Sequence, residues 1–212
     1  MNWNSLLFWR KPPIADLPAL ADFIDLQSAF LVQKGLHDYA RARSGHYAKV
    51  LFSEDWFIQA LERARWSAFP LGLAMVGEVT EGLLRPHART QSAQLEKISA
   101  LVLSVFDRYP RPEALEESEW KEARLALSQR LQFVGLHPVK RVIDIPETYA
   151  KTYWDLMPIH KSIRSRDFQT TQSYLKVVLC NIHDQLQRRM DAPAVADQLT
   201  KLPQAHMDAG NR

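Results

Sequence analysis

Apolar residues recur every three or four positions along most of the chain, which is the spacing of one face of an α-helix. Prolines and N-capping residues divide this pattern into about six segments. The sequence therefore predicts an all-α fold, a single domain with a four-helix core followed by a C-terminal helical pair. The expected helices cover residues 18–44, 54–84, 87–108, 113–134, 146–163 and 168–190.

The expected helical domain covers residues 17–191. An aromatic and basic N-terminal arm, residues 1–16, precedes it, and a weakly helical to disordered tail, residues 192–212, follows it. The connector GLHPVKRVIDIP, residues 135–146, is expected to be an extended linker because its one strand-like stretch has no partner strand.

The pattern also predicts which helical faces are buried. In the first expected helix, Phe23, Leu26, Phe30 and His37 lie on one side. The second is apolar all round near Pro70, which indicates a buried and kinked central helix. The last carries its expected inner face at Leu175, Val178, Leu179, Ile182, Leu186 and Met190.

Composition narrows the class of protein. The net charge of +3 arises from 27 basic and 24 acidic residues, without the clustered excess expected of a dedicated nucleic-acid binder. A single cysteine, Cys180, forms no internal disulfide, and it favours a reducing compartment such as the cytoplasm. The longest uncharged run, residues 66–77, has 12 residues and is too short to span a bilayer as a helix.

Chemistry-bearing residues are few and scattered. Cys180 and His183 stand three positions apart on one expected helix, where a histidine could activate the thiol. A site built from Glu78, His37, His160 and His183 requires several helices to bring unconnected residues together. We therefore predict no catalytic residue, no metal site and no cofactor, and we keep these five residues as the alternative.

The turn HKSIRSRD precedes the last expected helix and carries Lys161, Arg164 and Arg166. Three cations at the positive end of a helix dipole predict an anion-binding site. The alternative is a solvated basic loop, because Asp167 is placed to cap the same helix and to occupy its free N–H groups.

The N-terminal stretch NWNSLLFWRK combines large apolar side chains with two cations. This composition is typical of a segment that rests on a membrane surface or contacts a partner, and packing onto the chain's own domain is the alternative. The residues expected to make the contact are Trp3, Phe8, Trp9, Arg10 and Lys11.

Neither a glycine-rich phosphate loop nor a nucleophile elbow occurs in the sequence, which disfavours the common nucleotide-binding and hydrolase classes. The sequence therefore predicts a non-catalytic cytoplasmic interaction protein, an adaptor, assembly factor or regulator with a protein partner. Peripheral membrane association is an added hypothesis, and the oligomeric state is left open. The alternative is a helical-bundle enzyme, or a protein that binds a cofactor or metal through its histidines and a buried glutamate.

Overall fold

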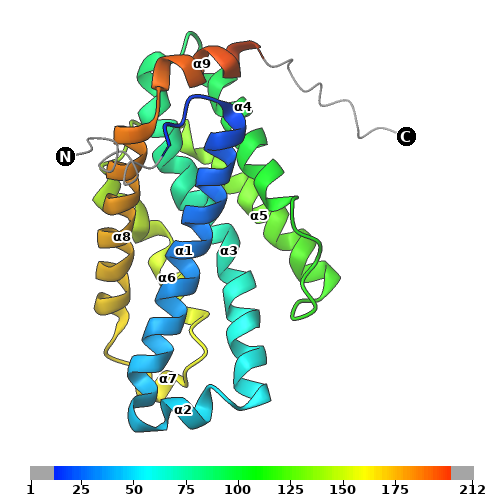
Figure 1. Cartoon of the computed structure of the whole chain (residues 1–212), viewed down its shortest axis with the longest axis vertical. Coiled ribbons are helices and arrows are strands. Elements are labelled where there is room, and N and C mark those ends of the chain that lie inside the picture. The colour runs from blue at the N-terminus through cyan, green and yellow to red at the C-terminus, as the bar shows by residue number, and fades with distance from the viewer. Residues whose placement is uncertain (1–11, 202–212) are drawn as a thin grey trace, which may run out of the picture.

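The computed structural model describes residues 12–201, which fold almost entirely into helices (Figure 1). Within these residues there are nine α-helices and no β-strand, so the predicted all-α class is confirmed, with more helices than the six expected. The α-helices are α1 (Leu17–Ser44), α2 (Ala48–Leu51), α3 (Asp55–Leu84), α4 (Gln91–Phe106), α5 (Glu117–Val134), α6 (Ala150–Asp155), α7 (Lys161–Arg164), α8 (Phe168–Arg189) and α9 (Ala192–Lys201). The 3₁₀-helices are η2 (Gly45–Tyr47), η3 (Arg85–His87) and η4 (Val142–Thr148).

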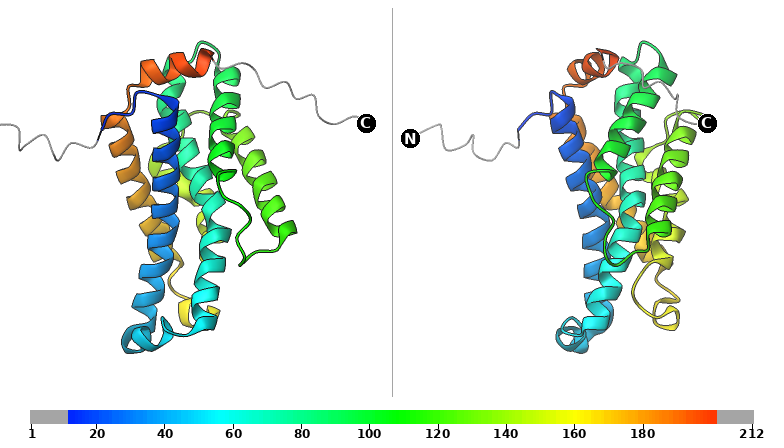
Figure 2. Two further views of the ribbon diagram at one scale, coloured as in Figure 1. Left: turned by 45° about the vertical axis from the view of Figure 1, so that its right-hand side comes forward. Right: turned by 90° about the vertical axis from the view of Figure 1, so that its right-hand side faces the viewer.

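Helices α1 and α3 pack against each other along the long axis and form the centre of the fold (Figures 1 and 2). Helices α4, α5 and α8 pack around this pair. Gly72 allows the two central helices to approach closely, because a Cβ atom there would lie 2.8 Å from the carbonyl oxygen of Ser28. Every residue of α3 from Ala68 to Glu81 is buried, so the predicted buried central helix is confirmed.

The predicted inner face of the first helix is wrong for three of its four residues. Leu26 and Phe30 are 65% and 46% exposed, and His37 is also exposed. Helix α1 has apolar residues on two sides, so spacing alone does not decide which side is buried. The inner face of α1 is formed by Leu20, Phe23, Ile24, Gln27, Leu31 and Gly35.

The predicted helix over residues 146–163 is interrupted. The chain forms η4, then α6, and then a helix-free stretch around Pro158 before the single turn of α7. The connector expected to be extended also folds, because part of it forms η4, whose Ile145 is buried and which packs against α8. A helical turn this short gains its stability from tertiary packing, here from the burial of Ile145, and the sequence pattern does not show that packing.

The packed body reaches beyond residues 17–191 at both ends. Ile14 is buried, and its backbone N–H donates to the carbonyl oxygen of Arg189 at 2.8 Å. Helix α9 buries Val195 and Leu199 and packs against α4, across one end of the bundle (Figure 2). Among the helices of residues 12–201, none combines the length and apolar character that a membrane span requires.

Candidate functional site

A groove of about 1050 Å³ lies between the first half of α3 and the irregular segment that joins α4 to α5. Its apolar walls are formed by Trp56, Ile58, Trp66, Tyr109, Pro110 and Pro112, and we call it the aromatic groove. Trp56 and Ile58 are 60% and 43% exposed. Large apolar side chains left in water on one surface are a feature of interaction sites.

The aromatic groove is preformed by contacts beneath it. The Trp66 ring packs edge to face against Tyr109 and Trp120, with ring centroids 5.3 and 6.0 Å apart. The Tyr109 hydroxyl donates to Asp25 Oδ1 on α1 at 2.8 Å. The floor is therefore tied to α1 and α5, and a ligand would meet a surface already in place.

The outer wall of the groove is held by two arginines. Arg63 donates to the carbonyl oxygen of Ala114 at 2.9 Å and forms an ion pair with Glu119. Arg111 donates to the carbonyl oxygen of Leu115 at 2.6 Å. Because these donors are used within the fold, the groove offers mainly aromatic and proline surfaces to a ligand.

Acidic residues dominate the charge around the aromatic groove. Glu54, Asp55 and Glu113 are near its rim and form no ion pair within the described part of the chain. The nearby Arg65 is paired with Glu62 at 3.2 Å and stacks on Trp66. Arg111 lines the groove without an ion pair among the described residues, so these three acids are offset by one cation. The remaining negative charge favours a partner that carries positive charge.

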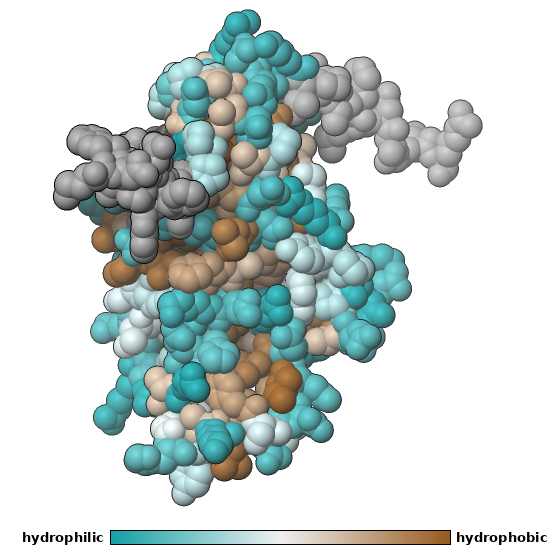
Figure 3. Space-filling model, in the orientation of Figure 1, coloured by the Kyte–Doolittle hydropathy of each residue, from teal (hydrophilic) through white to brown (hydrophobic). Residues whose placement is uncertain are grey.

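A second exposed surface lies at the end of the bundle formed by η2, α2 and α7, which we call the α2–α7 end (Figure 1). Its large apolar residues Tyr47, Val50 and Ile163 are 77%, 59% and 57% exposed. Figure 3 shows apolar surface among polar residues at this end of the molecule. The exposed lysines and arginines there that form no ion pair with another residue of 12–201 are Arg41, Lys49, Lys161 and Arg166, whereas the exposed Arg43 is paired with Asp167.

Asp167 links the segment between α7 and α8 to helix α1 at the α2–α7 end. It accepts a hydrogen bond from the Tyr39 hydroxyl at 2.6 Å and forms an ion pair with Arg43, both on α1. The Arg43 hydrogen bond, with that of Tyr39, lowers the pKa of Asp167, while burial and the Asp167 bond raise the pKa of Tyr39 to about 12. The prediction that Asp167 caps the following helix through its side chain is wrong, because α1 holds that carboxylate.

Arg164, predicted to bind an anion, has a different role. The residue is 2% exposed, and its guanidinium donates to the carbonyl oxygens of Ile159, Trp154 and Asp155. It also stacks on the Trp154 ring at 4.3 Å. Its donors therefore satisfy the end of α6 and the stretch that follows, which leaves Lys161 and Arg166 as the exposed cations of the predicted site.

The structure does not bring the candidate histidines together. His37 contacts the Phe52 ring at the α2–α7 end, and His160 accepts from the Ser162 backbone N–H at 3.3 Å. His183 lies on α8 beside Asp184, one turn from the partly buried Cys180. Across residues 12–201, no group of three or more His, Cys, Asp or Glu side chains is placed to hold a metal ion.

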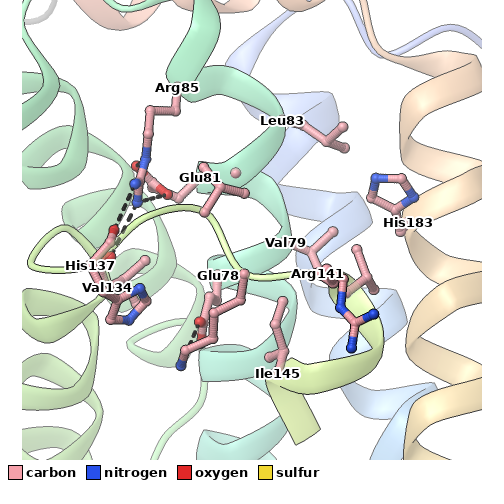
Figure 4. A pocket seen from close by; sticks show the side chains of 14 residues that line it. Glu78, Val79, Glu81, Leu83, Arg85, Val134, His137, Arg141, Ile145 and His183 are labelled. Atoms are coloured by element: carbon pink, nitrogen blue, oxygen red, sulfur yellow. Dashed lines mark hydrogen bonds and ion pairs between the residues drawn. The ribbon is translucent and has the colours of Figure 1, made fainter.

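Glu78 is 5% exposed and faces a cavity between α3, the connector after α5, and α8 (Figure 4). Its Oε2 accepts from the Tyr149 hydroxyl at 3.3 Å, and its Oε1 lies 3.1 Å from Lys140 Nζ. Burial, and then the charge of Glu78, raise the pKa of Tyr149. Figure 4 places His183 on the opposite side of this cavity from Glu81, Arg85 and His137.

One ion pair was not anticipated, between the buried Glu81 and the partly buried Arg85. Arg85 donates from Nε and Nη2 to the two oxygens of Glu81, both at 2.7 Å. It also donates to the carbonyl oxygens of His137 and Val134, at 2.8 and 3.1 Å. The i, i+4 spacing of Glu81 and Arg85 could have indicated the pair, but not the two carbonyls that complete it.

Sequence reasoning also missed the aromatic groove. Its residues come from two segments distant in the chain, and the sequence offers one local signal, the position of Trp56 directly after Glu54 and Asp55. The predicted contact residues Trp3, Phe8, Trp9, Arg10 and Lys11 lie outside the described residues. Comparison of the chain with protein-family models, with curated proteins and with solved structures finds no match.

Proposed function

We propose that the protein is a non-catalytic interaction protein that binds a segment of a partner polypeptide in the aromatic groove. The observation that carries this proposal is a preformed groove lined by Trp56, Ile58, Trp66 and Tyr109, with Trp56 60% exposed. Tryptophan, tyrosine and arginine are the residues most often found at the energetic centres of protein interfaces. The role is that of an adaptor, assembly factor or regulator, and the lone Cys180 supports a cytoplasmic location.

The size and charge of the groove define the partner. Its volume of about 1050 Å³ is at the upper limit of pockets for small molecules, and a polypeptide segment fills such a space with a few side chains. Aromatic and proline surfaces favour an apolar or aromatic side chain in the centre. The unpaired acids Glu54, Asp55 and Glu113 favour lysine or arginine beside it.

Replacement of Trp56 and Ile58 by alanine together tests this proposal. We expect recovery of the bound polypeptide from the native cell to fall roughly 30-fold, because loss of one interface tryptophan costs about 2 kcal/mol or more. The measurement is quantitative affinity capture with the full chain. Both residues are exposed, so the variant is expected to keep its fold, which circular dichroism checks.

Val177→Ala is the matched control, because Val177 is 62% exposed on α8, away from the groove. It should capture the same polypeptides as the unmodified chain. If the double variant also captures them undiminished, the groove is not the binding surface.

The α2–α7 end supports a second candidate function, contact with an anionic membrane surface. Exposed Tyr47, Val50 and Ile163 could enter the headgroup region, while Lys49 and Lys161 lie beside them without intramolecular ion pairs within residues 12–201. Each lysine or arginine near such a surface contributes about 1 kcal/mol. The N-terminal arm remains a predicted additional contact.

Charge reversal at Lys49 and Lys161 tests the membrane candidate. Glutamate at both positions is expected to weaken sedimentation with phosphatidylserine-containing vesicles at least roughly 30-fold, from the loss of about 1 kcal/mol per cation. Arg188→Glu is the control because Arg188 is 79% exposed near the other end of α8. Equal binding to neutral phosphatidylcholine vesicles, or equal loss with the control, would contradict the candidate.

A further inference from the structure

A cavity of about 250 Å³ lies behind η4, between α3, the connector of residues 135–141 and α8 (Figure 4). The surface exposed to the cavity is mainly apolar, although only six of the fourteen lining residues are aliphatic: Val79, Leu83, Val134, Val139, Val142 and Ile145. Glu78 lies among these apolar residues. A mainly apolar surface with a few polar groups is the usual composition of a site for a small molecule.

The Glu78 carboxylate is incompletely satisfied. The residue is 95% buried, and one oxygen, Oε2, accepts a hydrogen bond from the Tyr149 hydroxyl at 3.3 Å. The other oxygen, Oε1, accepts no hydrogen bond, although Lys140 Nζ lies 3.1 Å away in an ion pair without hydrogen-bonding geometry. A buried carboxylate oxygen without a donor is costly, and a donor from a ligand would remove that cost.

The other charged and polar groups around the cavity, apart from His183, have partners within the fold. Arg85 is bound to Glu81 and to two carbonyl oxygens, and Arg141 is paired with Asp144 at 2.7 Å. His137 Nδ1 lies 2.9 Å from the carbonyl oxygen of its neighbour in the chain. His183 also lines the cavity, and its Nδ1 lies 3.6 Å from Asp184 Oδ1. The buried acceptor without a hydrogen bond is Glu78 Oε1, which selects a ligand that donates a hydrogen bond and disfavours an anion.

Lys140 stands where such a donor would bind. It belongs to the surface connector, its side chain is 31% exposed, and its flexible stem can rotate into water. Within residues 12–201 it is the only cation paired with Glu78. Its departure would remove the one ion pair that the Glu78 carboxylate forms within the described residues.

We propose that this cavity binds a small primary ammonium compound with an aliphatic or aromatic body. The ammonium group replaces Lys140 and donates to Glu78 Oε1, and the body lies against Val79, Leu83 and Ile145. An ammonium carries three donors and a positive charge, so it supplies the hydrogen bond that Oε1 lacks and replaces the charge compensation that Lys140 provides. Lys140 acts as an internal competitor that occupies the carboxylate when the ligand is absent.

The test is an NMR titration of the full chain with n-hexylammonium, and with n-hexanol and n-hexanoate as matched probes. We expect saturable shifts at Val79, Leu83 and Val142 with n-hexylammonium, with a dissociation constant on the order of 0.1–1 mM for a ligand of this size. The uncharged alcohol should bind at least about tenfold more weakly. The carboxylate should not bind.

Two variants are expected to change the affinity in opposite directions. A general loss of folding would lower the affinity in both, so it cannot explain this result. Glu78→Gln keeps the shape of the side chain and should weaken n-hexylammonium binding about tenfold or more. Lys140→Gln removes the internal competitor and should strengthen binding several-fold. Unchanged affinity in Glu78→Gln, weaker affinity in Lys140→Gln, or no saturable shifts in the unmodified chain would each overturn the proposal.

Discussion

Arg85→Ala is expected to lower the free energy of unfolding by about 3–5 kcal/mol, the cost of removing one partner from a buried ion pair. Glu81 is 3% exposed within α3, so its carboxylate cannot turn into water when the guanidinium is lost. The carbonyl oxygens of Val134 and His137 would lose their arginine donor as well. Urea unfolding followed by circular dichroism measures the change.

The matched control is Arg141→Ala, which breaks a pair of the same chemistry at the surface. Arg141 is 80% exposed and is paired with Asp144 three residues away. Exposed pairs contribute about 0–1 kcal/mol, so this variant should remain close to the unmodified protein. Equal effects of the two substitutions would show that burial does not govern the Arg85 contacts.

Arg164→Ala is expected to lower the free energy of unfolding by about 2–4 kcal/mol, since buried carbonyl groups lose their donors and the Trp154 ring loses its stacking partner. Arg164 donates to three backbone carbonyl oxygens that follow or end α6. Arg164→Lys should recover only part of this loss, because one ammonium cannot reproduce the planar fork. Urea unfolding, monitored by tryptophan fluorescence, reports the change.

Arg166→Ala is the control for Arg164, because Arg166 is exposed two residues later. It should change stability by less than about 0.5 kcal/mol. The opposite pattern, a neutral Arg164→Ala that instead abolishes sulfate binding, would restore the anion site that the sequence predicted.

The long helices were predictable because apolar residues recur every three or four positions along each of them. Four of the six residues predicted for the inner face of the last helix are buried, Leu175, Leu179, Ile182 and Leu186, while Val178 and Met190 are partly buried and pack against the core. Between residues 135 and 163 the pattern fails, because short turns there are stabilised by contacts from distant residues. Arg164 donates to the carbonyl oxygens at and after the end of α6, although it follows Pro158 in the chain. In the sequence it belongs to a basic turn, where an arginine is expected to be exposed to solvent.

The candidate sites were less predictable than the helices. A tryptophan on an amphipathic helix can face the core or water, and Trp56 is exposed while Trp66 forms the floor of the groove. Glu78 could be recognised as unusual in the sequence, because a carboxylate on an apolar helix needs a partner. Which groups compensate it, Lys140 and Tyr149, depends on how the connector folds back onto α3.

The proposed function is tested most directly by photo-crosslinking from the aromatic groove in the native cell. A photoreactive residue at Gln59, which lines the groove, is compared with one at Gln187, which is exposed on α8. We predict a crosslink from position 59 to a polypeptide segment that contains aromatic and basic residues, lost when Trp56 is also replaced by alanine and absent from position 187. The same products from both positions, or products from position 59 that persist without Trp56, would contradict the groove as the binding surface.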